Sequence, residues 1–404
     1  MPRSTSRRGS VALLLAAVCA VVSGPAAAQL TVRARVPAST PAGATVYLAG
    51  SFNLWNPADS AFRLAAAGGG EYAITLPESV RGPVEFKLTL GSWDAVEADS
   101  AGGDVPNRRF TVPAAGAATY AATVARWRDG TPRPVPASTA RAGVSILDSA
   151  FAIPELGRTR RVWLYLPPDY HTSTRTYPVL YMHDGQNVFD AATAFAGEWG
   201  VDEALDSLHA LGDPGAIVVA VDNGGQRRLD EYSPWRNARY GGGEGDEYVD
   251  FLVNTLKPYV DSHYRTRPDR LNTGIAGSSM GGLISLYAAL KHPEVFGRAG
   301  VFSPALWFAD SLYAHARRAR PHRPDPRLYF VTGALEGETP EVYVRGQRVM
   351  VDSLAAAGFA IGVEVDSLIR ADGTHSEWFW RREFPAAYRW LFSASRGAVF
   401  VRRN

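Results

Sequence analysis

With 404 residues, of which 46% are hydrophobic and 20% charged, the chain has the composition of a globular protein and is long enough for two domains. A formal net charge of +2 excludes the strongly basic surface that is typical of nucleic-acid-binding proteins. The only cysteine is Cys19, so a disulfide framework within one chain is excluded.

The first 28 residues have the pattern of a secretory signal peptide. Arg7 and Arg8 precede an uncharged apolar run from Val11 to Val22, and Ala26-Ala27-Ala28 supplies small residues for cleavage. The run is shorter than the ~20 apolar residues of a membrane-spanning helix. We therefore expect residues 1–28 to be removed, the protein to be secreted or periplasmic, and the mature chain to have neither a thiol nor a membrane span.

Residues 29–125 predict a small all-β, immunoglobulin-like sandwich. Short runs of alternating apolar residues are separated by Gly, Pro, Asn and Asp, as in such sandwiches. The runs are Thr31 to Val36, Thr45 to Ala49, Glu71 to Leu76 and Val84 to Leu90. Residues 126–142 have no apolar periodicity and contain Pro132, Pro134 and Pro136, which predicts a semi-rigid linker.

Residues 143–404 alternate between apolar strands and amphipathic helices, which predicts a mostly parallel sheet with helices on both faces. The expected strands are Val162 to Leu166, Pro178 to Met182, Ala216 to Val221, Thr273 to Ala276, Gly297 to Phe302, Leu328 to Thr332 and Ile361 to Val365. The expected helices include Val201 to Ala210, Glu247 to Tyr264, Gly281 to Leu290 and Glu341 to Ala357.

Ser279 is the candidate nucleophile. It lies in Gly277-Ser278-Ser279-Met280-Gly281, a G-x-S-x-G run between an expected strand and an expected helix. A sharp strand-to-helix turn exposes the serine hydroxyl in α/β-hydrolases. The short pattern also arises by chance in a glycine-rich chain, so the remaining residues must support it.

A serine nucleophile requires a histidine base and an acid, which follow it in this order in α/β-hydrolases: serine, acid, histidine. His292 ends a helix, and His315 and His322 lie in an Arg-rich stretch that we expect at the surface. His375, in a turn after the last expected strand, is therefore the candidate base; a helix-capping turn with an incidental histidine is the alternative.

Two glutamates follow the strand Leu328 to Thr332. Glu336 is the candidate acid and Glu338 the reserve, although either one is also explained as a solvated loop residue.

The oxyanion of an acyl-transfer reaction requires two backbone donors. The expected donors are the N–H groups of Met280, directly after the serine, and of Gln186, in the loop after Pro178 to Met182.

His183 and Asp184 in this loop lack a spaced third metal ligand, so we interpret them as residues that hold the loop. No metal and no organic cofactor is implied. Trp199, Trp235 and Trp307 are candidates for an aromatic or sugar pocket, or for the core.

These residues resemble the esterase-D-like family of α/β-hydrolases, from about Ser145 to Phe392. The resemblance rests on the runs from Arg161 to Tyr170, from Val179 to Asn187 and from Arg228 to Pro234, together with the Ser279 elbow, Phe302-Ser303-Pro304 and the His375 turn. It implies the α/β-hydrolase fold and a serine esterase, since the family includes siderophore, feruloyl and acetyl-xylan esterases and mycolyltransferases. The family's Gly-His-Asn-Glu turn is Thr374-His375-Ser376-Glu377 here, which leaves the histidine in place.

The N-terminal part resembles starch- and glycogen-binding sandwiches through the runs from Val46 to Pro57 and from Glu85 to Asp94. This resemblance implies a glucan ligand at Trp55, Trp93 and Lys87, because aromatic faces stack on sugar rings. Burial of the tryptophans in the sandwich core is the alternative.

The sequence thus predicts a secreted serine esterase acting on a small-molecule or polysaccharide ester. Two alternatives remain open: an acyltransferase of the mycolyltransferase type, in which the site excludes water, and a carbohydrate-binding protein with a silent hydrolase domain.

Overall fold

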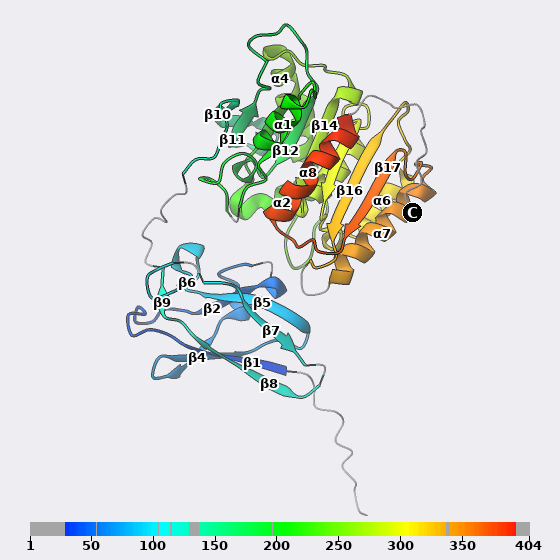
Figure 1. Ribbon diagram of the computed structural model, residues 1–404. Helices are drawn as coiled ribbons and strands as arrows, with labels where there is room; N and C mark the ends of the chain where they lie inside the picture. Colours follow the sequence, from blue (N-terminus) through cyan, green and yellow to red (C-terminus); the bar gives the residue numbers. More distant parts are fainter. Residues whose placement is uncertain are drawn as a thin grey trace, which may run out of the picture. The chain divides into compact units, whose positions relative to one another are not determined.

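The computed structural model describes residues 29–53, 55–103, 105–113, 115–128, 137–195, 197–336 and 340–392. The chain forms two compact units, Met1–Gly130 and Thr131–Asn404, which are coloured in sequence order in Figure 1. The predicted signal peptide lies outside the described residues, as does most of the Pro-rich part of the predicted linker.

The described residues of the N-terminal unit form β-strands and short 3-10 turns. Its strands are β1 (Gln29–Arg35), β2 (Tyr47–Gly50), β3 (Ala65–Gly68), β4 (Glu71–Thr75), β5 (Gly82–Thr89), β6 (Glu97–Ala98), β7 (Arg108–Val112), β8 (Ala117–Thr123) and β9 (Arg126–Trp127). They pair as β3-β4-β1-β8, β2-β5-β7 and β6-β9. Alternating residues such as Val32, Leu48 and Phe86 are buried in one core between these sheets. The alternation in the sequence therefore arises from strands that bury one face.

An eight-stranded sheet forms the centre of the C-terminal unit, in the order β10-β11-β13-β12-β14-β15-β16-β17. Its strands are β10 (Val144–Ile153), β11 (Arg158–Tyr165), β12 (Val179–His183), β13 (Ile217–Val221), β14 (Thr273–Ser278), β15 (Arg298–Phe302), β16 (Arg327–Gly333) and β17 (Val365–Arg370). The strands from β13 to β17 pair in parallel, whereas β10 and β11 are antiparallel additions at one edge.

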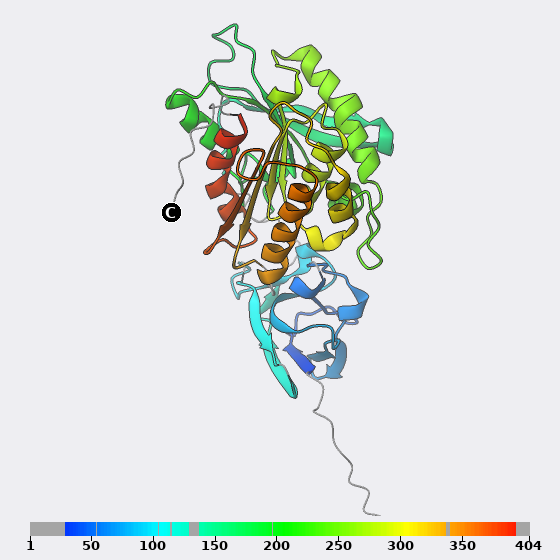
Figure 2. The ribbon, with the colours of Figure 1, turned by 90° about the vertical axis from the view of Figure 1, so that its right-hand side faces the viewer.

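Helices cover both faces of this sheet. They are α1 (Val201–Ala210), α2 (Arg228–Glu231), α3 (Gly245–Phe251), α4 (Lys257–His263), α5 (Met280–Lys291), α6 (Ser311–Arg318), α7 (Pro340–Ala356) and α8 (Glu377–Phe392). Figure 2 shows α8 on one side of the sheet and α7 on the other. In β12, Leu180 and Met182 pack into the core under α1 and α8, while Val179 and Tyr181 pack into the opposite core. A strand buried on both faces is apolar throughout, as in a parallel sheet.

The strand order reverses at β12: the next strand in the chain, β13, pairs on one side of β12, and β14 pairs on the other side. The carboxyl ends of parallel strands beside such a reversal form the usual crevice for ligands in open α/β sheets. The loop after β12 contains Gln186, and the turn after β14 contains Ser279. The topology therefore brings the two loops of the predicted oxyanion site to the same edge.

Two predicted elements differ from the structure. The last strand is Val365–Arg370 rather than Ile361 to Val365, because Ile361 and Val363 are exposed apolar residues of the preceding turn. The predicted helix from Glu247 to Tyr264 has a π-helical segment, Leu252–Leu256, directly before the Lys257-Pro258 start of α4. Proline has no N–H for a helix bond, which accounts for the altered pattern there.

Candidate active site

Ser279 lies on a strained turn between β14 and α5. Its backbone has φ 57° and ψ −120°, a conformation that L-residues rarely adopt. Its N–H donates to the carbonyl of Phe302 at 3.0 Å, and its carbonyl accepts from the N–H of Ala305 at 3.0 Å. Ser279 is half-exposed between the buried residues Ser278 and Met280. The turn is thus fixed by β15 and by the residues after it, and it presents the serine toward solvent.

Two glycines allow this turn to pack closely. A Cβ atom at Gly277 would lie 2.9 Å from the carbonyl carbon of Gly281, and one at Gly282 would lie 2.8 Å from the carbonyl oxygen of Phe302. Side chains at these positions would displace the backbone that holds Ser279.

His375 and Glu336 form a hydrogen-bonded pair. The Nδ1 atom of His375 lies 3.0 Å from Oε2 of Glu336, whose side chain is completely buried. Oε1 of Glu336 accepts hydrogen bonds from Ser303 Oγ and from the N–H of Gly333. A carboxylate with these partners favours the histidine tautomer that carries its proton on Nδ1, which leaves Nε2 as an acceptor. The reserve acid Glu338 lies outside the described residues.

Aromatic side chains surround the His375 ring. Tyr343 of α7 lies 4.8 Å from it between ring centroids, and Trp380 of α8 lies 5.2 Å away and nearly perpendicular. Trp380 also donates from Nε1 to Ser303 Oγ at 2.9 Å. The same side chain therefore contacts the histidine and a residue that holds its carboxylate partner.

The three tryptophans suggested for a pocket lie in different surroundings. Trp307 is half-buried and donates from Nε1 to the Tyr343 hydroxyl at 3.2 Å, which connects it to the His375 surroundings. Trp199 is 3% exposed and packs against Phe302 and Trp380, so it belongs to the core. Trp235 packs against Tyr287 of α5 and His315 of α6, and like Trp307 it lies against the core on the face of the sheet opposite Trp199.

The expected oxyanion donors both lie in the first turn of a helix. Met280 is the first residue of α5, and Gln186 lies in a 3-10 turn, Gly185–Asn187, directly after β12. N–H groups in the first turn of a helix have no carbonyl partner within that helix, so they are suited to bind an anion. The side chain and carbonyl of Gln186 are engaged by Asn223 and Thr193, which fixes the loop.

A partly buried ion pair holds the loop after β12. Nε and Nη2 of Arg228 donate to the two carboxylate oxygens of Asp184 at 2.6 and 2.8 Å, and Asn223 donates to Asp184 as well. Burial opposes ionisation of Asp184, but the Arg228 guanidinium outweighs it and lowers the pKa of this carboxyl. His183 bonds the Tyr248 hydroxyl at 3.0 Å, and burial lowers its pKa to about 4, so it is neutral at physiological pH. Both residues hold the loop, as interpreted from the sequence.

The remaining histidines lie away from the Ser279 turn. His292 follows the C-terminus of α5 and bonds Glu294, and His322 is exposed. The expectation that His315 is a surface residue is wrong, because it is half-buried against Trp235 and Tyr287, and burial lowers its pKa.

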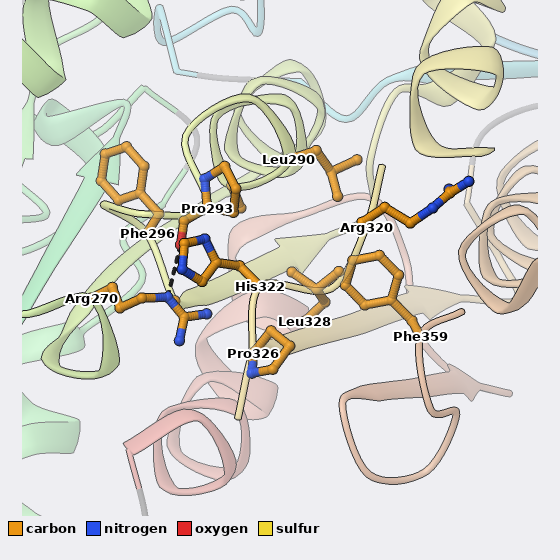
Figure 3. A pocket seen from close by; sticks show the side chains of 11 residues that line it. Arg270, Leu290, Pro293, Phe296, Arg320, His322, Pro326, Leu328 and Phe359 are labelled. Carbon is orange, nitrogen blue, oxygen red and sulfur yellow. Dashed lines mark hydrogen bonds between the residues drawn. The ribbon is translucent and has the colours of Figure 1, made fainter. Parts of the chain in front are cut away.

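A small hollow, drawn in Figure 3, lies at the end of the sheet where β15 and β16 begin, whereas Ser279 follows the carboxyl end of β14. It lies near the C-terminus of α5 and the starts of β15 and β16, and its lining includes Arg270, Pro293, His322 and Leu328. Nε of Arg270 donates to the Pro293 carbonyl at 2.8 Å. The hollow is therefore separate from the candidate active site.

In the N-terminal unit, Trp55 and Trp93 lie in contact, with ring centroids 6.3 Å apart, and both are half-buried. Trp55 has a positive φ of 59°, an uncommon conformation for a bulky residue. Lys87 on β5 donates to the Val105 carbonyl at 2.5 Å. The structure thus brings together the two aromatic residues that the sequence suggested for a sugar platform.

Sequence reasoning did not single out Tyr343 and Trp380, whose rings lie beside His375, nor assign a role to Glu377, Ser303 or Arg228. Glu377, Ser303 and Arg228 occur in the motifs that carry the family resemblance, so a signal was present for them. Tyr343 belongs to α7. The sequence pattern of this segment indicates an amphipathic helix but does not show which residue Tyr343 contacts.

Among the described residues, no helix is both long and apolar enough to cross a membrane. Within the same ranges, no three His, Cys, Asp or Glu side chains are grouped so that they can hold a metal ion.

The putative esterase family matches residues 153–391, the segment that contains the Ser279 turn, Glu336 and His375. The chain belongs to this family. An endo-1,4-beta-xylanase/feruloyl esterase of Xylanibacter ruminicola is 26% identical over 232 residues, which are 56% of this chain and 28% of that protein. Family membership and the esterases among the relatives identify the chain as a carboxylic ester hydrolase.

Two further comparisons concern a shorter segment of the chain or the fold alone. An alpha-amylase of Niallia circulans is 50% identical over 109 residues, which are 27% of this chain and 8% of that much longer protein. The solved enterochelin esterase of Shigella flexneri matches with a TM-score of 0.51 at 16% identity, covering 86% of this esterase and 88% of that chain. The esterase thus has the α/β-hydrolase type of fold, to which its mixed sheet with helices on both faces conforms.

Proposed function

We propose that the chain is a secreted serine esterase with Ser279 as nucleophile, His375 as general base and Glu336 as the acid that orients the histidine. The observation that carries the proposal is the hydrogen bond of 3.0 Å between His375 Nδ1 and the buried Glu336 carboxylate. Glu336 is favoured over Glu338 by this bond. The strained, half-exposed turn of Ser279 is further support, since α/β-hydrolases expose their nucleophile in this way.

In the proposed reaction, His375 Nε2 accepts the proton of Ser279 as Oγ attacks the ester carbonyl carbon. The backbone N–H groups of Met280 and Gln186 stabilise the resulting oxyanion. His375 returns the proton to the departing alcohol, which leaves an acyl group on Ser279. Water then attacks this acyl-enzyme as His375 takes its proton, and the carboxylic acid leaves as Ser279 regains a proton.

The proposed substrates are esters with a sugar or aromatic part, such as feruloyl or acetyl-sugar esters, or siderophore esters. Trp307 and Tyr343 support this class, because they place aromatic surface beside His375. Aromatic faces pack against sugar rings and aromatic acyl groups. The feruloyl esterase named among the relatives favours the same class.

For the N-terminal unit we propose an immunoglobulin-like module that binds a glucan through Trp55, Trp93 and Lys87. The contact between the two tryptophans supports a shared platform, and the segment of about 109 residues in common with an alpha-amylase is close to this unit in length. Retarded migration in a gel containing soluble starch tests the proposal. Trp93→Ala should abolish the retardation while Trp378→Ala, in the esterase unit, should retain it; unretarded wild-type protein would exclude glucan binding.

Replacement of the nucleophile tests the esterase proposal. Ser279→Ala should abolish hydrolysis of 4-nitrophenyl butyrate without a change in the thermal unfolding midpoint. Ser207→Ala, on the exposed face of α1, is the matched control and should retain full activity. Turnover by Ser279→Ala at the wild-type rate would refute the assignment of the nucleophile.

A further inference from the structure

Glu377 is an acidic residue beside the candidate catalytic histidine. It begins α8, two residues after His375, and its side chain is half-exposed. Its carboxylate interacts electrostatically with His375, Asp184 and Arg228. A methyl group at Gly197, in the loop before α1, would lie 3.5 Å from Cβ of Glu377. Glu377 therefore lies between the histidine turn and the loops that follow β12 and β13.

Arg228, the arginine that favours the ionised form of Glu377, is already paired. Arg228 donates two hydrogen bonds to Asp184, so their charges cancel and the guanidinium offers little net attraction to a bound anion. No hydrogen bond or ion pair joins the Glu377 carboxylate to another side chain within the described ranges. Burial raises the pKa of Glu377, whereas His375 and the Arg228 guanidinium favour its ionised form. When ionised, Glu377 is thus a negative charge beside an Asp184 and Arg228 pair that is neutral overall.

The other cations of α8 near this turn are paired as well. Arg381 donates to Glu198 at 2.9 Å, and Arg382 donates to Asp372 at 2.5 Å while its guanidinium lies over the Trp378 ring. Both arginines of α8 near this turn are therefore matched by acids, whereas Glu377 has no side-chain partner among the described residues. Such a site repels a negatively charged ligand, and the repulsion weakens as salt screens it.

We propose that Glu377 is a specificity-determining residue that makes the esterase select uncharged esters and reject esters with an anionic group near the scissile bond. This inference rests on the proposed function, since it concerns substrates of the Ser279 site. It favours neutral hydroxyl-rich or aromatic esters, such as acyl sugars, over anionic siderophore or dicarboxylate esters. A carboxylate at this position also accepts hydrogen bonds from hydroxyl groups, as a sugar substrate would supply.

Two chromogenic esters of similar size test the proposal, because 4-nitrophenyl butyrate is neutral and 4-nitrophenyl hemisuccinate is anionic. The measured quantity is the ratio of kcat/KM for the anionic ester to that for the neutral one, at about pH 8 and low salt. A change in His375 basicity affects both esters and cancels in this ratio. Glu377→Gln should raise the ratio about threefold to tenfold, as expected for one charge at a partly solvated distance. Glu247→Gln, at an exposed position on α3, is the matched control and should leave it unchanged.

A second test of the proposal uses the wild-type enzyme alone. Raising the salt concentration should increase its kcat/KM for the hemisuccinate and leave that for the butyrate nearly constant. Equal ratios in wild type and Glu377→Gln, with no salt effect on the hemisuccinate, would overturn the inference while leaving the esterase intact. Failure of folded wild-type protein to hydrolyse either ester or to react with a fluorophosphonate would overturn the proposed function and this inference with it.

Discussion

His375 Nδ1 lies 3.0 Å from Oε2 of Glu336, a carboxylate that is completely buried. The second oxygen of this carboxylate is held by Ser303 Oγ and by the N–H of Gly333. Because both oxygens are engaged, rotation of the carboxylate would break several bonds in a buried place. The pair therefore fixes the orientation of the imidazole, which a general base requires.

Glu336→Gln tests whether the charge of this residue is needed. The amide retains the size of the side chain but removes the carboxylate that stabilises the imidazolium. We expect kcat for 4-nitrophenyl butyrate to fall about 10²-fold to 10⁴-fold, with a small change in KM. Steady-state kinetics on folded protein measures this, with Glu247→Gln as the control. A decrease of less than about tenfold would show that Glu336 is not the triad acid.

Trp380→Phe tests the indole bond to Ser303, which is 2.9 Å long and buried. The variant leaves the Ser303 hydroxyl without this donor, so we expect the free energy of unfolding to fall by about 1 kcal/mol. Urea unfolding measures the change. Trp378→Phe is the control, because its indole is 49% exposed and bonds a half-exposed Thr374. An equal or larger loss in the control would contradict a stabilising role for the buried bond.

Asp184→Asn tests the ion pair that holds the loop after β12. The change leaves the Arg228 charge without its carboxylate, and we expect a loss of about 3 kcal/mol in unfolding free energy. The double variant Asp184→Asn/Arg228→Met should recover part of this loss, because no unpaired charge remains. Urea unfolding of the single and double variants measures the coupling. Strictly additive losses would indicate that the two residues do not act as a pair.

Asp202 should make stability depend on pH in the opposite direction to an ordinary ion-paired carboxylate. Burial raises its pKa from 3.8 to about 7, and the adjacent Glu203 carboxylate adds to the shift. Between these values the folded chain retains a proton that the unfolded chain has released. Stability should therefore fall as the pH rises from about 4 to about 7 and level off above that.

Asp202→Asn removes this titration and retains the oxygen that accepts from the Arg141 N–H. We expect the variant to match wild type near pH 4.5 and to be more stable by about 1 kcal/mol or more near pH 8. Urea unfolding at both pH values measures the difference, with Asp148→Asn, at an exposed position, as the control. An equal effect at the two pH values would be inconsistent with a raised pKa at Asp202.

Local patterns in the sequence predicted the elements that surround the site. The helix expected from Val201 to Ala210 has these bounds in the structure, and the strand expected from Thr273 to Ala276 is β14, extended by two residues. The pairing of Glu336 with His375 is predicted only from the order of serine, acid and histidine in the chain and from the position of Glu336 after an expected strand. The contact itself forms because Glu336 follows β16 and His375 follows the neighbouring parallel strand β17.

Other features depend on contacts between distant segments and have no local signal. The aromatic residues Tyr343 and Trp380 reach His375 from different helices on opposite faces of the sheet. Hydrophobic periodicity predicts that such residues are buried, but not which partner they contact. The sequence pattern does not predict the strand β10. The alternation of apolar and polar residues is interrupted around Asp148, where the pairing of β10 with β11 has an irregular register.

Labelling with a fluorophosphonate, followed by peptide mass spectrometry, tests the central claim most directly. Such a probe reacts with a serine hydroxyl that a neighbouring base activates. The account predicts a single adduct on Ser279 in the folded protein, and loss of the adduct in His375→Ala. An adduct on another serine, or undiminished labelling of Ser279 in His375→Ala, would contradict a Ser279 nucleophile activated by His375.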